Sequence, residues 1–150
     1  MNPDFVEILS ALSAAQAEFI IVGAHALAAH GVPRATGDLD IWVRPTHENA
    51  ERVLRALKEF GSPLFDLSSE DLTRNGTVFQ IGIAPSRIDI LTSITGVGWN
   101  EAWVGRLTLN IADVRVAVLG RSEFIANKRA TGRPRDLADI AMLESAEAPE

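Results

Sequence analysis

Patterns typical of strands and of helices alternate along the chain, and this alternation most limits the folds open to it. The run 19–22 is apolar and ends at a glycine, which is typical of a buried strand. Asn2 can cap a first helix whose buried positions recur at helical spacing. Further strands are predicted at 38–43, 78–83, 87–91, 107–109 and 114–119, and further helices at 24–30, after Thr46, at 122–130 and at 134–143. This order predicts an α+β fold with helices packed on a mixed sheet.

Length and composition favour one folded domain over residues 1–150. The segment 61–76 breaks every period and is interpreted as a surface excursion, and the acidic tail 144–150 is expected to fray. The chain has no cysteine, which excludes disulfides and thiolate metal sites. No apolar run is long enough to span a bilayer and no signal core begins the chain, so we expect a cytoplasmic protein without a membrane partner.

The net charge of −6 argues against a protein whose whole surface grips nucleic acid. It leaves a local basic patch open, and four cations do gather within eight positions. Lys128, Arg129, Arg133 and Arg135 form this cluster, with Asp136 and Asp139 directly after it. The arginines and Asp139 are as well explained by a solvated surface of salt bridges as by a site.

Two carboxylates with matching parity form the most informative motif. In a strand, Asp38 and Asp40 point to one face, while Leu39 and Ile41 point to the other, which is the core face. Two like charges about 7 Å apart repel each other unless a cation or water covers them. Asp89 also projects opposite to core residues on a later strand. If the two strands are neighbours, the three carboxylates converge.

Three converging carboxylates are ligands that suit Mg²⁺, which completes its shell with water and substrate phosphate. Such a site can stabilise the attacking and leaving oxygens of a phosphoryl displacement. The alternative is an exposed strand face with no ligand. The junction Gly23-Ala24 adds weight to the site, because small residues there let a phosphate approach the backbone closely.

At this point the sequence resembles the DNA polymerase β-like nucleotidyltransferase superfamily. The matching signature is Val22-Gly23-Ala24, thirteen residues, then Asp38-Leu39-Asp40-Ile41. The stretch 22–31, followed by 34–40, is similar more narrowly to the abortive-infection (AbiE-type) toxin-like branch. The C-terminal motif of Lys128, Arg133, Asp136 and Asp139 resembles the later motif of that branch. The likeness spans most of the chain.

The resemblance implies a mixed, mostly antiparallel sheet flanked by helices. It implies a Mg²⁺-dependent transfer of a nucleoside monophosphate from an NTP to an acceptor hydroxyl, with release of pyrophosphate. Asp38, Asp40 and Asp89 would be both the metal ligands and the catalytic residues. Gly23 and Ala24 would cradle the triphosphate and Lys128 would bind a phosphate. Ala24 departs from the family's Gly or Ser, and it lacks a hydroxyl that could donate to a phosphate oxygen.

Three further residues are candidates for contacting the nucleotide. His25 follows the Gly-Ala junction, although a histidine on a short Ala-rich helix is more often packed in the core. Arg34 can contact a phosphate and Thr36 can orient Asp38, or both can simply shape the loop. Trp42 shares the parity of Asp38 and Asp40 and is expected to line the cleft that holds the nucleotide.

Other functions compete with the transferase. One is a catalytically degenerate module that binds nucleotide or regulates without turnover, and another is a metal-dependent phosphodiester hydrolase. The acceptor cannot be chosen from the sequence, and RNA, protein and small molecules all stay open. The resemblance also keeps open an antitoxin partner, as for a toxin–antitoxin pair, and a homodimer that encloses the cleft.

Overall fold

We analysed a computed structural model of the chain, which describes residues 1–32 and 37–146. Six strands form one sheet in the order β3-β4-β2-β1-β6-β5. The strands are β1 (Phe19–Val22), β2 (Leu39–Val43), β3 (Val78–Ile81), β4 (Ile88–Leu91), β5 (Leu107–Ile111) and β6 (Val114–Val118). The helices are α1 (Pro3–Ala14), α2 (Gly23–Ala29), α3 (His47–Phe60), η1 (Asp71–Thr73), α4 (Trp99–Val104), α5 (Arg121–Thr131) and α6 (Pro134–Ser145).

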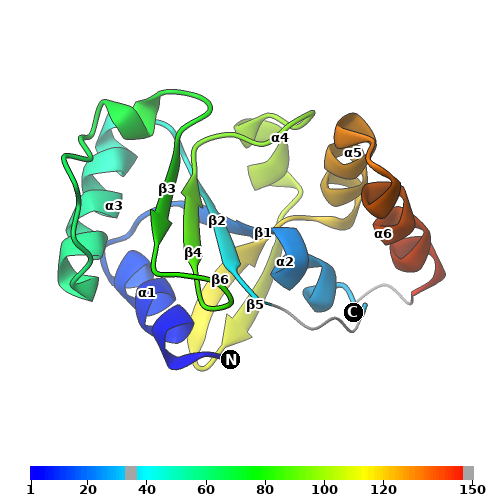
Figure 1. Ribbon diagram of the computed structural model, residues 1–150, viewed down its shortest axis with the longest axis horizontal. Coiled ribbons are helices and arrows are strands. Elements are labelled where there is room, and N and C mark those ends of the chain that lie inside the picture. The colour runs from blue at the N-terminus through cyan, green and yellow to red at the C-terminus, as the bar shows by residue number, and fades with distance from the viewer. Residues whose placement is uncertain (33–36, 147–150) are drawn as a thin grey trace.

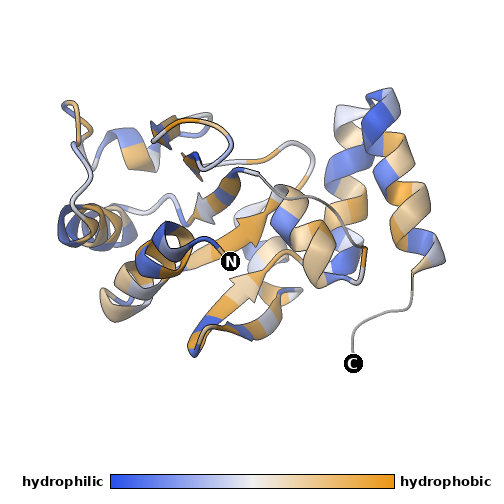
Figure 2. Ribbon diagram, turned by 60° about the horizontal axis from the view of Figure 1, so that its bottom comes forward, coloured by the Kyte–Doolittle hydropathy of each residue, from blue (hydrophilic) through white to orange (hydrophobic). Residues whose placement is uncertain are grey.

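The sheet is mixed, as predicted. The pairs β1–β2, β3–β4 and β5–β6 are antiparallel, and the pairs β1–β6 and β2–β4 are parallel. Helices α1 and α3 pack on each other, and the α5–α6 hairpin lies at the opposite end of the molecule from α3 (Figure 1). The strands are mainly hydrophobic, whereas the helices show both hydrophobic and hydrophilic stretches (Figure 2). Amphipathic helices therefore cover an apolar sheet, as the sequence periods predict.

Local signals in the sequence fix where the helices begin. Asn2 accepts a hydrogen bond from the backbone N–H of Asp4, and Thr46 accepts one from Asn49, so both predicted N-caps are confirmed. The buried Asn49 side chain also bonds Glu18 and the carbonyl of Arg44, which ties α3 to the strands beside it. These contacts satisfy polar groups that burial would otherwise leave without partners.

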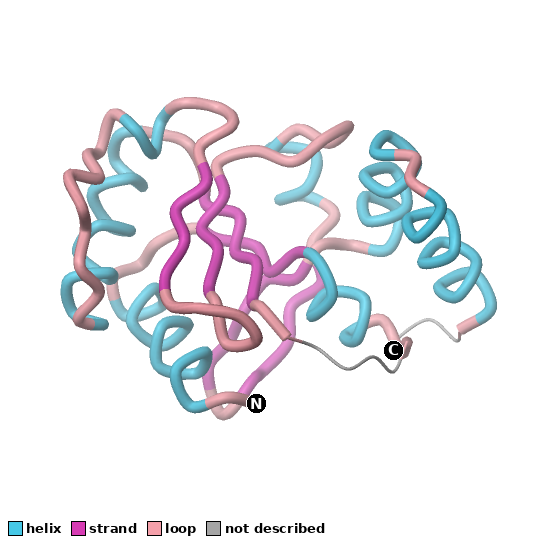
Figure 3. Tube along the Cα trace, in the orientation of Figure 1, coloured by secondary structure: helices cyan, strands magenta, loops and turns pink. Residues whose placement is uncertain are grey.

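Several segments differ in detail from the sequence predictions. The segment 61–76, predicted as a surface excursion, lies at the edge of the molecule beside α3 and contains the short helix η1 (Figure 3). Helix α4 was not predicted, because six residues rich in aromatic side chains carry little helical period. Helix α6 continues to Ser145, two residues beyond its predicted end. None of the described helices is both long and apolar enough to cross a bilayer.

Candidate functional site

The parallel pairing of β2 with β4 brings the predicted carboxylates together. Asp40 lies directly opposite Asp89 in the register of these two strands, and Asp38 precedes the first residue of β2. Leu39, Ile41 and Ile90 are fully buried on the other face. The predicted parity is therefore what the strands have, with apolar side chains in the core and carboxylates on the opposite face.

Asp40 lies against the predicted Gly-Ala junction. The antiparallel pairing of β1 with β2 places Val22 opposite Asp40, so that Gly23 is the next residue along β1. Gly23 has φ +70°, and a Cβ atom there would overlap the carboxylate of Asp40. Glycine is thus required twice, for its backbone conformation and for the close approach of Asp40. Strand β1 ends at Val22, and Gly23 is already the first residue of α2.

Negative charge is concentrated in this cluster. Burial, followed by the charges of Asp89 and Asp38 and a hydrogen bond with Asp89, raises the pKa of Asp40 to about 6. The guanidinium of Arg87 opposes this shift but does not cancel it. Burial and the neighbouring carboxylates therefore disfavour the charged form of Asp40 more strongly than the guanidinium favours it.

Arg87 places a cation inside the cluster. Its Nε donates to Asp89 Oδ1 at 2.9 Å, and its second guanidinium arm lies 3.3 Å from Asp89 Oδ2 and 3.2 Å from Asp38 Oδ2. Its backbone N–H donates to Asp38 Oδ1 at 3.1 Å. One arginine therefore bridges two of the three carboxylates.

The donor chemistry of this cluster fits a hard divalent cation, because it consists of carboxylate oxygens that repel one another. The positions of these carboxylates, however, are those of an ion-pair network with Arg87. Within residues 1–32 and 37–146, no group of three His, Cys, Asp or Glu side chains is placed to hold a metal ion. Asp38 and Asp89 would have to exchange the guanidinium for a metal ion in order to bind it, so Mg²⁺ binding stays a prediction.

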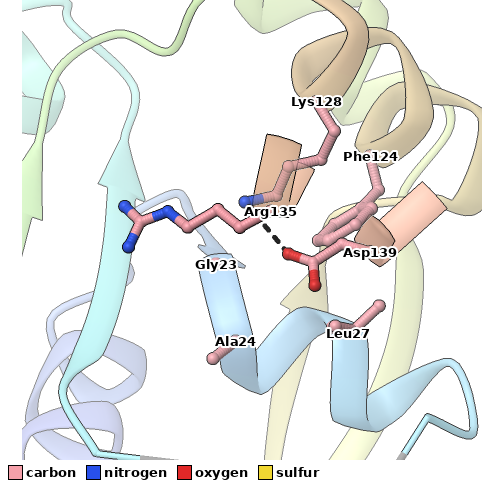
Figure 4. A pocket seen from close by; sticks show the side chains of 7 residues that line it. All are labelled: Gly23, Ala24, Leu27, Phe124, Lys128, Arg135 and Asp139. Carbon is pink, nitrogen blue, oxygen red and sulfur yellow. Dashed lines mark ion pairs between the residues drawn. The ribbon is translucent and has the colours of Figure 1, made fainter. Parts of the chain in front are cut away.

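A pocket of about 200 Å³ adjoins the cluster at Gly23 (Figure 4). It is lined by Gly23, Ala24, Leu27, Phe124, Lys128, Arg135 and Asp139. Three of the residues predicted to bind nucleotide, Gly23, Ala24 and Lys128, therefore meet in one cavity. Its volume is below the roughly 300–1,000 Å³ of sites that enclose a drug-sized ligand, so it has room for phosphate groups more readily than for a whole nucleotide.

Ion pairs connect Lys128 to the acidic residues of α6. Its Nζ lies 3.5 Å from Asp136 Oδ1 and 3.8 Å from Asp139 Oδ2, and its side chain is mostly buried. In Figure 4 the Arg135 side chain extends past Gly23, away from Lys128 and Asp139. The pocket thus has a cation on one wall and a second, exposed cation at its margin.

Asp136, by contrast, is used within the fold. It is fully buried, accepts from the Nε of Arg133 at 2.7 Å and closes the capping box at the start of α6. The bond from Arg133, which outweighs burial, holds the pKa of Asp136 well below its usual range. The sequence left two interpretations of the C-terminal cations open, a set of salt bridges or a site. The contacts of Arg133 and Asp136 are those of a salt bridge that holds the fold.

The remaining predicted residues are placed differently. The His25 ring packs edge-on against Phe5, hydrogen-bonds the backbone of Gly37 and is not among the residues lining the pocket. Burial lowers the pKa of His25. Arg34 and Thr36 lie outside the described residues. The expectation for Trp42 is wrong, because its ring is buried against Trp99 in the core.

Sequence reasoning missed one member of the cluster and left two pocket residues undecided. Arg87 carried a usable signal, since it stands two residues before Asp89 and so points to the same face. Arg135 and Asp139 were named, but their helical spacing does not say which partner lies opposite. Their position in the pocket depends on how the α5–α6 hairpin docks beside α2.

No protein-family model matches the chain, and no curated protein sequence matches it. Solved structures do match. A candidate nucleotidyltransferase from Thermotoga maritima aligns with a TM-score of 0.61 and 16% identity, over 94% of this chain and 92% of that one. Lincosamide antibiotic adenylyltransferase LnuA with bound lincomycin aligns with a TM-score of 0.60 and 13% identity, over 97% of each chain. The chain therefore has the fold of nucleotidyltransferases, and the predicted fold class is confirmed.

Proposed function

We propose that this chain, which has the nucleotidyltransferase fold, transfers a nucleoside monophosphate from an NTP to an acceptor hydroxyl. The observation that carries the proposal is the convergence of Asp40 and Asp89 in paired register, with Asp38 beside them and Gly23 opening onto a cationic pocket. Strand pairing alone does not require three carboxylates on one face. Carboxylates grouped in this way would hold divalent cations, and such cations stabilise the attacking and leaving oxygens of an in-line phosphoryl displacement.

The proposed reaction forms one bond and breaks one. The acceptor hydroxyl oxygen attacks the α-phosphorus, and the bond between that phosphorus and the α–β bridging oxygen breaks, so that pyrophosphate leaves with the electron pair. Asp89 takes the hydroxyl proton. Mg²⁺, held by Asp38, Asp40 and Asp89 when bound, would supply Lewis-acid stabilisation of the reacting oxygens.

The pocket supplies the binding of the triphosphate. Lys128 presents a compact ammonium to phosphate oxygens, and Arg135 adds a guanidinium at the margin. Gly23 lines the pocket, and its backbone lies against Asp40, where a Cβ atom would overlap the carboxylate. Ala24 contributes space and no hydroxyl, so affinity for phosphate depends on the two cations. His25, Arg34 and Thr36 stay predictions as further nucleotide contacts.

The acceptor stays open among RNA, protein and small molecules. The structural neighbour LnuA is an antibiotic adenylyltransferase, which favours including aminoglycosides and lincosamides among the acceptors tested. This chain and that neighbour align over 97% of each. A toxin role with an antitoxin partner, the AbiE-type branch and a homodimer stay proposals from the sequence resemblance.

The test is a labelling assay with α-³²P-labelled NTPs, Mg²⁺ and a panel of tRNA, cell-lysate protein, aminoglycosides and lincosamides. We expect the label to enter one acceptor, with pyrophosphate released from γ-labelled NTP in equal amount. Asp40→Asn should reduce transfer by about 10³-fold or more, the scale of a lost electrostatic contribution to the transition state. Asp113→Asn, the same change at an exposed turn between β5 and β6, should leave the rate unchanged.

A nucleotide-binding module without turnover is the second candidate. The absence of a hydroxyl at Ala24 and the bridging of two carboxylates by Arg87 favour it. Calorimetry that shows NTP binding, together with no label transfer to any acceptor and no pyrophosphate, would select this candidate. Release of the α-label as free NMP, with no labelled acceptor, would indicate that the protein is a hydrolase.

A further inference from the structure

Arg87 occupies an unusual place for a basic residue in a cluster that is proposed to bind a cation. The end of its side chain contacts Asp89 through Nε at 2.9 Å and Asp38 through its second arm at 3.2 Å. Its side chain is only one-third exposed, and those of Asp38 and Asp89 are less exposed still. The guanidinium therefore takes up carboxylate lone pairs that a metal ion would use.

The fold holds Arg87 in this position. Leu39 donates its backbone N–H to the carbonyl of Arg87 at 2.9 Å, which aligns Arg87 with Asp38 at the start of the β2–β4 ladder. Arg87 and Asp89 are two residues apart, so their side chains lie on the same face. Both carboxylates are thus within reach of one planar fork, which suits bidentate pairing.

We infer that Arg87 is a positioning residue that takes the place of a divalent cation in the metal-free protein. It holds Asp38 and Asp89 together against their repulsion, and it lowers the affinity of the protein for that cation. The inference rests on the proposed function, because it takes the three carboxylates as the cation site. A guanidinium and a metal ion compete here in two ways, for the same oxygens and by charge repulsion.

The test is a titration of the metal-free protein with Mn²⁺, without nucleotide, followed by the electron paramagnetic resonance signal of the free ion. We expect Arg87→Gln to bind Mn²⁺ about tenfold or more tightly than the unmodified protein, because it removes one nearby positive charge. Arg87→Lys keeps the charge but loses the fork, and it should bind with intermediate affinity. Arg52→Gln is the matched control, since Arg52 pairs with Glu48 on α3, away from the cluster, and should change nothing.

Thermal unfolding provides a second measurement that does not depend on activity. In EDTA, Arg87→Gln should have a lower Tm than the unmodified protein, because the carboxylates lose their counterion. Added Mn²⁺ should raise the Tm of Arg87→Gln more than that of the unmodified protein. A loss of Tm that Mn²⁺ does not restore would mean that Arg87 acts in folding alone, and would overturn the inference.

The two levels of the proposal fail differently. If the unmodified protein binds Mn²⁺, Asp40→Asn weakens binding, and Arg87→Gln binds no more tightly, the inference is wrong and the proposed cation site stands. If neither the unmodified protein nor Arg87→Gln binds Mn²⁺, both are wrong. If Arg87→Gln does not fold, the affinity of Arg87→Lys relative to the unmodified protein decides in the same way.

Discussion

The carboxylate cluster on β2 and β4 and the charged α5–α6 hairpin are both rich in acidic and basic side chains, but they balance charge differently. Around Asp40, among residues 1–32 and 37–146, one guanidinium pairs with two of the three carboxylates, and the pKa of Asp40 rises. Around Asp136, one carboxylate is surrounded by Arg133 and Lys128, and its pKa falls. The first region retains surplus negative charge at a cost in stability, whereas the second uses its charges to hold two helices together.

This contrast separates a candidate site from a structural network. Evolution tolerates unfavourable charge mainly where function needs it, and perturbed pKa values cluster at such sites. Lys128 links the two regions, because it lines the pocket beside Gly23 and also pairs with Asp136 and Asp139. Variants that act on one region and not the other can therefore test the division.

After the loss expected for Asp40→Asn, the next largest effect on transfer is expected for Gly23→Ala. The new Cβ would overlap the Asp40 carboxylate, and alanine is strained at φ +70°, so Asp40 must move away from Asp89. A displacement of about 1 Å at a reacting group costs about 100-fold in rate, and we expect a loss of NMP transfer of that size. Steady-state label transfer at saturating NTP measures it.

Gly61→Ala is the matched control for Gly23→Ala. Gly61 also has positive φ, at the end of α3, but nothing lies within 4 Å of a Cβ atom there. It carries the backbone strain without the overlap. Equal losses of rate in the two variants would show that the close approach of Asp40 to Gly23 has no part in transfer.

A smaller effect is expected for Lys128→Gln. Removing a charged donor to phosphate should raise KM for the NTP about tenfold, with a smaller change in kcat. Arg129→Gln changes the same charge one residue away on α5, where Arg129 pairs with Glu144 on the surface, and should leave KM unchanged. A Tm that falls with an unchanged KM would assign Lys128 wholly to the helix hairpin.

The sequence predicted most of the elements and the convergence of the carboxylates for one physical reason. Strand parity is a local property, and the side that Asp38, Asp40 and Asp89 face follows from the apolar residues between them. That Asp89 lies opposite Asp40 required one non-local fact, the parallel pairing of β2 with β4, which the sequence left as a condition and the structure supplies.

What the sequence left undecided depends on docking between distant segments. Helix α4 forms where Trp99 packs on Trp42. The spacing of apolar residues within its six positions does not predict this contact. The contacts of Arg133, Arg135, Asp136 and Asp139 depend on the turn between α5 and α6, and helical spacing allows several pairings among them. To predict that Arg87 bridges Asp38 and Asp89, one needs both the shared face of Arg87 and Asp89 and the register of β2 against β4.

The smallest effect is a dependence of stability on pH, and its sign differs between the two regions. The pKa of Asp40 is about 6 in the folded protein and 3.8 as the ordinary value, so the folded state holds this proton more tightly. Ionised Asp40 therefore destabilises the fold above pH 6, and the penalty disappears as pH falls from 6 to about 4. Asp40→Asn, measured by urea unfolding in EDTA, should gain on the order of 1–2 kcal/mol at pH 8 and about nothing at pH 4.

Asp136→Asn should show the opposite sign. The pKa of Asp136 is held below its ordinary range, so its stabilising charge is present at neutral pH and is lost as pH falls below about 4. Asp136→Asn should therefore be less stable than the unmodified protein at pH 8, and the difference should shrink in acid. If both substitutions lowered stability at pH 8, the cluster around Asp40 would not carry surplus negative charge, and the contrast between the two regions would be lost.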